Sequence, residues 1–381
     1  MPIFDEFDRN HVGPANSVQT QFWYLNHSNR PEAGRVRETL EQWFDRYPES
    51  HRSTLLNRLR SPVDEEHLSA FFELLLHEFL LRSDHRIVAI EPTLEHTDRS
   101  PDFEVEGPCG GRFYLEAVLA TGKSHEERSA QRRLNEAVHE VESADAPMHF
   151  LELRIAGKPT QQVSLRLLRR QLRDWIALLP AEPDAVDPEP FVFCEHEMEL
   201  TVTAYLRNRP RTSSGSAIGV QWMEPCWRHP GDGIRESVGR KANRYGRLNA
   251  PYVVAVNMLD NYSGTDDLLD ALFGSPCVII RTYDDGRIED RPSRNQDGVW
   301  WGPQGIQHRG LSAVLGFPRL TPWSLAQRTA HLVRNPWAIN PLPEVLLNTA
   351  EINPTPEGRF SRVHGAPLSN HFQLDANWPE I

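Results

Sequence analysis

The strongest hydrophobic pattern in the chain lies over residues 64–82, which read DEEHLSAFFELLLHEFLLR. A helix of this length has about five turns, and this one would be apolar on nearly all sides. Its first turn is acidic, which suits the positive end of the helix dipole. We therefore expect a buried helix here, preceded by two shorter helices over 32–47 and 53–59.

Short strand-like runs follow this helix and are separated by turn-rich segments. They cover 85–91, 102–105 and 112–120, and the last two are predicted to form a hairpin. The next predicted elements are a helix over 126–143, a strand over 149–155 and a helix over 164–179. The order α-β-β-β-α-β predicts an α/β (α+β) fold with a mixed β-sheet core flanked by helices.

The length of 381 residues suggests two or three domains, or one core with large additions. The acidic, proline-rich segment 180–190 is the clearest internal boundary. We expect four parts: an N-terminal helical segment over 1–62, a core over 63–180, a part with a basic helix over 181–283, and a C-terminal wrapping segment over 284–381. The third part has two interpretations, an extension of the first sheet or a second α/β layer.

The composition is typical of a soluble globular chain, with a net charge of −12 and 39% hydrophobic residues. The four cysteines form no CxxC pair, which argues against a zinc ribbon or a disulfide framework. The N-terminus lacks a signal-peptide pattern, and no run approaches the ~18 apolar residues of a membrane span. We expect a cytoplasmic protein with no membrane partner. Phosphate-loop, dinucleotide-binding, HExxH and GxSxG motifs are absent from the sequence.

Two carboxylates on the predicted hairpin are the candidate chemistry of the chain. Asp102 opens one strand after Pro101, and Glu116 lies 14 positions later in the next strand. Side by side at a sheet edge, these carboxylates and one backbone carbonyl suffice to hold Mg²⁺. The flanks of Glu116 are apolar, and an unpaired carboxylate buried there would be costly. The alternatives are a turn-capping role for Asp102 and a partly exposed strand position for Glu116.

These residues resemble the PD-(D/E)XK nuclease superfamily, in which a Pro-Asp strand is followed by a Glu-x-Lys strand. Pro101-Asp102 matches the first half of the motif and Glu116-Ala117 matches most of the second, within about residues 64–180. The resemblance implies a restriction-endonuclease-like core. It also implies that Asp102, Glu116 and the carbonyl of Ala117 bind Mg²⁺ or Mn²⁺.

The predicted buried helix carries two further polar residues, Glu73 and His77. The resemblance implies that Glu73 is an additional metal ligand or positions a water molecule. The two residues are four positions apart and share one helix face. A metal-proximal pair and a buried Glu–His hydrogen bond are both open.

The sequence departs from the motif at Val118, which stands where the motif has its lysine. Valine can neither orient an attacking water molecule nor stabilise charge on a phosphate. The search for a replacement is short, because the chain has only three lysines: Lys123, Lys158 and Lys241. Lys158 is set aside because it lies on a predicted loop.

Lys123 lies at the turn after the second hairpin strand, and Lys241 lies on a basic helix predicted over 234–248. On that helix Lys241 shares a face with Arg244 and Tyr245 by i, i+3 and i+4 spacing. We favour Lys241 over Lys123 as the replacement. The alternatives are a solvated helix face at 241 and an ordinary loop lysine at 123.

Nucleic-acid binding by a chain of negative net charge requires a locally basic surface. Arginines on two predicted helices are the candidates: Arg128, Arg132, Arg240 and Arg244. Solvated helix faces would give the same pattern.

The function expected from the sequence is hydrolysis of nucleic acid by a Mg²⁺-dependent nuclease, with DNA favoured over RNA. A role in bacterial defence or repair is implied by the resemblance alone. The alternative is a catalytically inactive protein with the nuclease fold that binds nucleic acid or acts as a scaffold. A homodimer or a partner protein is left open.

Overall fold

The computed structural model describes residues 1–180, 188–211, 215–223, 230–260, 263–343, 349–355 and 359–380. The chain folds into two compact units. Unit 1 comprises Met1–Asn10, Leu25–Gly122 and Arg228–Ile381, and unit 2 comprises His11–Tyr24 and Lys123–Trp227. Helix α1 (Gln21–His27) contains one of the sequence boundaries between the units.

Unit 1 is built on an eight-stranded mixed sheet with the order β1-β2-β3-β8-β13-β14-β15-β16. The strands are β1 (Arg86–Ile90), β2 (Phe103–Glu106), β3 (Arg112–Ala120), β8 (Tyr252–Met258), β13 (Ala313–Pro318), β14 (His331–Arg334), β15 (Ala350–Pro354) and β16 (Phe360–Val363). β1, β2 and β3 are antiparallel, whereas β3, β8 and β13 run parallel to one another. β8 is buried at every position, as its apolar sequence YVVAVNM predicts for a central parallel strand.

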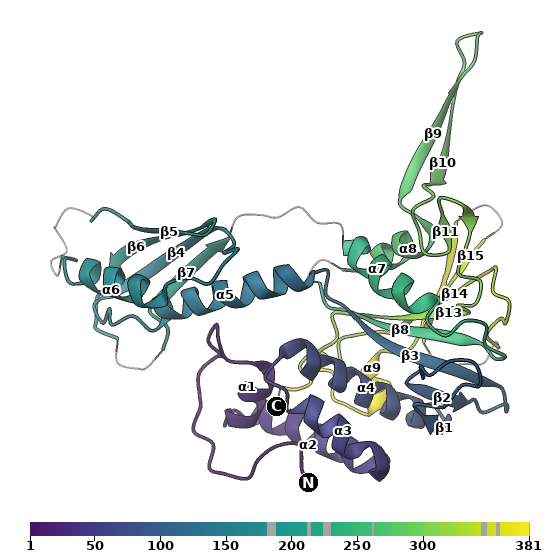
Figure 1. Cartoon of the computed structure of the whole chain (residues 1–381), viewed down its shortest axis with the longest axis horizontal. Coiled ribbons are helices and arrows are strands. Elements are labelled where there is room, and N and C mark those ends of the chain that lie inside the picture. The colour runs from purple at the N-terminus through teal and green to yellow at the C-terminus, as the bar shows by residue number, and fades with distance from the viewer. Residues whose placement is uncertain are drawn as a thin grey trace. The chain divides into compact units, whose positions relative to one another are not determined.

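Helices cover both faces of this sheet (Figure 1). On one face, Phe72 and Phe79 of α4 (Asp64–Arg82) place their rings against Phe317 of β13. On the other face, α7 (Pro230–Ala242) and α8 (Thr265–Phe273) share an apolar layer with residues of β3 and β8. Helices α2 (Pro31–Arg46), α3 (Glu49–Leu59) and α9 (Leu368–Phe372) complete the helical part around α4.

Unit 1 also carries short peripheral strands. β9 (Pro276–Thr282) and β10 (Ile288–Arg294) form a two-stranded hairpin, which extends away from the body of unit 1 in Figure 1. β11 (Trp301–Gly302) and β12 (Gly305–Ile306) form a small second ribbon.

Unit 2 is a four-stranded sheet with two helices. Its strand order is β5-β6-β4-β7, with β5 (Phe191–Glu195), β6 (Met198–Leu206), β4 (His149–Gly157) and β7 (Ile218–Met223). Helices α5 (His125–Glu142) and α6 (Leu165–Ile176) lie on one face of the sheet (Figure 1). The core of unit 2 lies between that face and these helices.

The mixed α/β architecture with helices on a mixed sheet is confirmed, and α4 and β3 have the predicted bounds. The prediction that the strand over 149–155 completes the sheet of a core over 63–180 is wrong. That strand is β4 and belongs to the sheet of unit 2, while β8 takes the place beside β3. Local patterns predict that a strand forms, but its partner depends on tertiary packing.

The C-terminal region also differs from the prediction of a wrapping segment over 284–381. Strands β13 to β16 extend the main sheet of unit 1, and β13 pairs directly with β8. Within the part over 181–283, β8 joins the sheet of unit 1, while β5, β6 and β7 form the sheet of unit 2 together with β4. Among the described residues, no helix combines the length and apolar content needed to cross a bilayer.

Candidate functional site

The register of the β2–β3 hairpin brings Asp102 to Ala117. Phe103 pairs with Leu115, so positions just before Phe103 lie opposite positions just after Leu115. The backbone N–H of Ala117 donates to Asp102 Oδ2 at 2.6 Å. The same register sets Ala117 opposite Pro101, which has no N–H to donate to the Ala117 carbonyl. The Pro-Asp pair therefore ends the ladder and puts a carboxylate beside the backbone of Ala117.

Glu116 is buried, and both of its carboxylate oxygens have partners. Lys241 Nζ donates to Oε1, and the Tyr245 hydroxyl donates to Oε2. The side chains of the ion pair are 15% exposed for Lys241 and 3% for Glu116. Because an unpaired buried carboxylate is costly, these two contacts are what stabilise Glu116 inside the sheet.

The lysine comes from the last turn of α7, which ends at Ala242 and not at residue 248 as predicted. The N–H of Arg244 donates to the Lys241 carbonyl at 3.1 Å in the turn that follows. This turn still brings Tyr245 to Glu116, and its hydroxyl also lies 2.9 Å from the carbonyl oxygen of Ser100. Tyr245 was not predicted as a site residue, although its i, i+4 spacing from Lys241 was a usable signal.

α7 is held close to β3 by small and apolar residues. A Cβ on Gly233 would lie 2.6 Å from the Cα of Gly122, just beyond the end of β3. Ile234 and Val238 of α7 belong to the same buried cluster as Val118. Val118, at the position of the motif lysine, thus helps to seat the helix that supplies Lys241.

Glu73 has partners that the sequence analysis did not identify. The Tyr47 hydroxyl donates to its Oε1 at 2.7 Å, and Arg58 Nη1 donates to its Oε2 at 2.6 Å. Tyr47 comes directly after α2, and Arg58 lies on α3. Nothing in the local sequence pattern indicated that their polar groups would point to Glu73.

His77 does not share the hydrogen-bonded cluster of Glu73. Its Nδ1 has no hydrogen-bond partner among the described residues, and its ring lies 4.8 Å from the Tyr47 ring. Burial lowers the pKa of His77 to about 4, so this histidine is neutral at ordinary pH. The buried Glu73–His77 hydrogen bond that the sequence left open is not found.

Asp102 lies in the field of both other carboxylates. Burial, then Glu116, then Glu73 raise the pKa of Asp102 to about 8, against the opposing effects of the Ala117 N–H and Lys241. The pKa values of the Tyr47 and Tyr245 hydroxyls are also raised, first by burial and then by the adjacent Glu73 and Glu116 respectively. Both tyrosines therefore remain protonated donors to their carboxylates.

The donor set fits a hard divalent cation. Within the described ranges, the Ala117 N–H is the only hydrogen bond to the Asp102 carboxylate, so Oδ1 has no hydrogen-bond partner there. Burial raises the pKa of Asp102 most, and repulsion by Glu116 and Glu73 adds to it; a cation would relieve this repulsion. No three His, Cys, Asp or Glu side chains of the described part form a ready-made metal cluster. Two carboxylates with a backbone carbonyl form a smaller set, as Mg²⁺ often uses.

The other predicted site residues lie outside unit 1 or on α7 and the turn after it, where the Arg244 guanidinium is 6.0 Å from the centroid of the Tyr245 ring. Lys123, Arg128 and Arg132 belong to unit 2, and their roles stay predictions. Arg240 and Arg244 are exposed, on α7 and on the turn after it. Within unit 1, the structure brings together Asp102, Ala117, Glu116 and Lys241.

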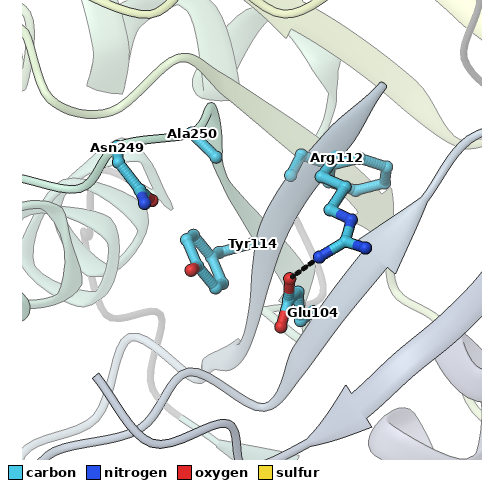
Figure 2. A pocket seen from close by; sticks show the side chains of 6 residues that line it. Glu104, Arg112, Tyr114, Asn249 and Ala250 are labelled. Atoms are coloured by element: carbon cyan, nitrogen blue, oxygen red, sulfur yellow. Dashed lines mark hydrogen bonds and ion pairs between the residues drawn. The ribbon is translucent and has the colours of Figure 1, made fainter. Parts of the chain in front are cut away.

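A pocket lies at the start of β3 (Figure 2). Tyr114 lies two positions before Glu116 on that strand and therefore shares its face. Tyr114 lines the pocket with Glu104, Arg112, Phe113, Asn249 and Ala250. The Glu104–Arg112 ion pair, drawn as a dashed line in Figure 2, holds one wall at 3.2 Å.

Comparison with models of known protein families, with curated protein sequences and with solved structures found no match.

Proposed function

We propose that the chain is a Mg²⁺-dependent nuclease whose active site lies in unit 1, with a core related to the restriction-endonuclease fold. The observation that carries the proposal is the ion pair between Lys241 and Glu116. In this ion pair, Lys241 of α7 takes the place of the motif lysine that is missing at Val118 of β3. It reaches the same face of the sheet as Val118. A random surface lysine has no reason to reach a buried carboxylate beside Asp102.

Each residue has a role in this proposal. Asp102, Glu116 and the carbonyl of Ala117 would hold the metal ion. When bound, Mg²⁺ would polarise a phosphoryl oxygen and acidify a water molecule. Lys241 would stabilise the negative charge that grows on the phosphate and orient the water. Glu73, fixed by Tyr47 and Arg58, would position solvent next to Asp102.

The reaction is phosphodiester hydrolysis. The water oxygen forms a bond to phosphorus, and the bond from phosphorus to the leaving sugar oxygen breaks. The water proton passes to solvent, and the leaving oxygen takes up a proton. The residues of unit 1 contribute alignment and charge stabilisation, which are the main sources of rate enhancement in phosphoryl transfer.

A second candidate function has its own support. Both oxygens of Glu116 are already bonded, to Lys241 and to Tyr245, which would suit a closed and purely structural cluster. The chain would then be an inactive nuclease-like protein that binds nucleic acid as a scaffold.

The two functions are separated by a cleavage assay with the purified chain. Plasmid, linear duplex DNA, single-stranded DNA and RNA are incubated with Mg²⁺, with Mn²⁺ and with EDTA. Metal-dependent cleavage that is lost in Glu116→Ala supports the nuclease and excludes the scaffold. Binding without cleavage in every condition excludes the nuclease.

A further inference from the structure

The sheet of unit 2 has one open face. Along β4, Leu151, Leu153 and Ile155 are buried towards α5 and α6, so the alternate positions point to the opposite side. Among the described residues of unit 2, no helix covers that side (Figure 1). The register of β6 and β7 on β4 assigns their side chains to the same two faces.

Three aromatic side chains lie on this open face, one from each of three adjacent strands. Phe150 of β4 is 46% exposed, Tyr205 of β6 is 52% exposed, and Trp222 of β7 is 60% exposed. Phe150 pairs with Tyr205 across the β4–β6 ladder, and Trp222 pairs with Arg154 across β4–β7. A gathering of large rings on one exposed face is unusual for a surface without a ligand.

Arginines accompany the rings. The Arg207 guanidinium lies 3.5 Å from the centroid of the Phe150 ring, in a cation–π contact. Arg209 follows on the same segment, and neither Arg207 nor Arg209 forms an ion pair within the described part of the chain. The Arg211 guanidinium instead donates to the carbonyls of Gly215 and Ala144. The end of β6 thus combines two rings with positive charge that no carboxylate of the described residues neutralises.

A hydrogen bond from its hydroxyl holds the ring of Tyr205 in place. Its hydroxyl donates to Glu152 Oε2 at 2.9 Å, and Arg154 pairs with Glu152 Oε1 at 2.7 Å. Both oxygens of Glu152 are therefore bonded to residues of the same face, Tyr205 and Arg154. A fixed ring costs less entropy when a flat ligand stacks on it.

We propose that the open face of unit 2 binds single-stranded nucleic acid, with bases stacked on Phe150, Tyr205 and Trp222 and phosphates on Arg207 and its neighbours. Rings on an open sheet with arginines beside them match the two parts of a nucleotide, a flat base and an anionic phosphate. The inference rests on the proposed function only in taking nucleic acid as the ligand. It does not depend on whether unit 1 cleaves.

The test measures binding of a fluorescein-labelled oligothymidylate of about 15 nucleotides to the full chain. Fluorescence anisotropy reports the binding, and EDTA is present so that nothing is cleaved. Trp222→Leu keeps an apolar side chain and removes the ring, and it is expected to weaken binding about tenfold. Trp222→Phe keeps a ring and should bind within about twofold of the wild type. Val192→Ala, an aliphatic change on the same face, is the matched control and should have no effect.

A second readout guards against a folding defect. Oligonucleotide binding should quench tryptophan fluorescence, and the quench should shrink in Trp222→Phe while its affinity is kept. Equal affinities of wild type and Trp222→Leu, or no binding by the wild type at any salt concentration, would overturn the inference. So would a loss of binding in Val192→Ala equal to that in Trp222→Leu, because the oligonucleotide would then not depend on the aromatic rings.

Failure of this inference can be told apart from failure of the proposed function. If the wild type binds the oligonucleotide through Trp222 but cleaves nothing with Mg²⁺, the inference stands and the nuclease is excluded. If the wild type cleaves and Trp222→Leu binds normally, the nuclease stands and the inference fails.

Discussion

At the scale of single residues, the site is organised by the need to keep Glu116 charged inside a sheet. Its neighbours along β3 are apolar, so the carboxylate depends on Lys241 and Tyr245 for its stability. An ion pair of this kind adds little against a hydrophobic replacement of both partners, but loss of one partner is costly. The cluster is therefore better explained by a demand for chemistry than by a demand for stability.

Lys241→Met tests this dependence. The change leaves Glu116 buried without its cation, and we expect a loss of about 3 kcal/mol in the free energy of unfolding. Glu116→Gln combined with Lys241→Met should recover most of that loss. Urea unfolding followed by tryptophan fluorescence measures the effect, with Lys158→Met as the control. Equal stability of the two single lysine variants would contradict the burial argument.

The raised pKa of Asp102 predicts a pH dependence of stability. The folded carboxyl keeps its proton up to about pH 8, whereas the unfolded one releases it near pH 3.8. The unfolded state therefore binds fewer protons in this window, and the free energy of unfolding should fall as pH rises from about 4 to about 8. Asp102→Asn should remove this contribution, because asparagine carries no titrating carboxyl. Its side-chain oxygen can still accept the Ala117 N–H.

Mg²⁺ is expected to bind the carboxylate of Asp102. A cation bound to ionised Asp102 offsets the carboxylate repulsion, so Mg²⁺ should raise the melting temperature of the wild type more above pH 8 than well below it. Thermal melts of wild type and Asp102→Asn, with Mg²⁺ and with EDTA, measure both effects. An identical Mg²⁺ response in the two proteins would show that the ion binds elsewhere.

At the scale of elements, the position of α7 decides whether the lysine reaches the carboxylate. α7 touches the end of β3 at Gly233, where a Cβ would meet the backbone of Gly122. A small shift of a helix that carries a catalytic group is enough to lose much of the rate enhancement which that group provides.

Gly233→Ala should push α7 away from β3 and lower any cleavage rate by about a hundredfold, with about 1–3 kcal/mol lost in stability. Gly239→Ala on the same helix is the matched control, since a Cβ there meets nothing within 4 Å. It should raise stability by about 0.5–1 kcal/mol and leave the rate unchanged. The pair of variants is compared by single-turnover cleavage and by thermal melts, and equal rates would refute the positioning role of Gly233.

The sequence predicted those parts of the site that depend on local order. Asp102 and Glu116 could be placed together because a hairpin register links positions close in the chain. Lys241 could be favoured because the chain has only three lysines. Tyr47 and Arg58 could not be found, since their contacts with Glu73 depend on how α2 and α3 pack against α4.

At the scale of the whole molecule, the sequence pattern did not indicate which strands far apart in the chain pair with one another. β3 pairs with β8, and between them in the chain lies the segment Lys123–Trp227 of unit 2. Side-chain patterns report burial and period, not the partner of a strand across such an interval. The same limit explains why β4 was assigned to the wrong sheet and why β13 to β16 were not recognised as strands of the main sheet.

The two units suggest a division of tasks in our account. Unit 1 holds the carboxylate and lysine cluster, and unit 2 offers an open aromatic face. The net charge of −12 means that binding must rely on local groups such as Arg207, and it should weaken steeply with added salt.

The most direct measurement of the central claim is the Mg²⁺-dependent cleavage rate of labelled single-stranded and duplex DNA by four proteins. These are the wild type, Glu116→Gln, Lys241→Met and Lys158→Met. We predict cleavage by the wild type and Lys158→Met that EDTA abolishes, and a loss of about a hundredfold or more in Glu116→Gln and Lys241→Met. Cleavage that survives in Lys241→Met at the rate of Lys158→Met, or no cleavage by the wild type with any metal, would contradict the account.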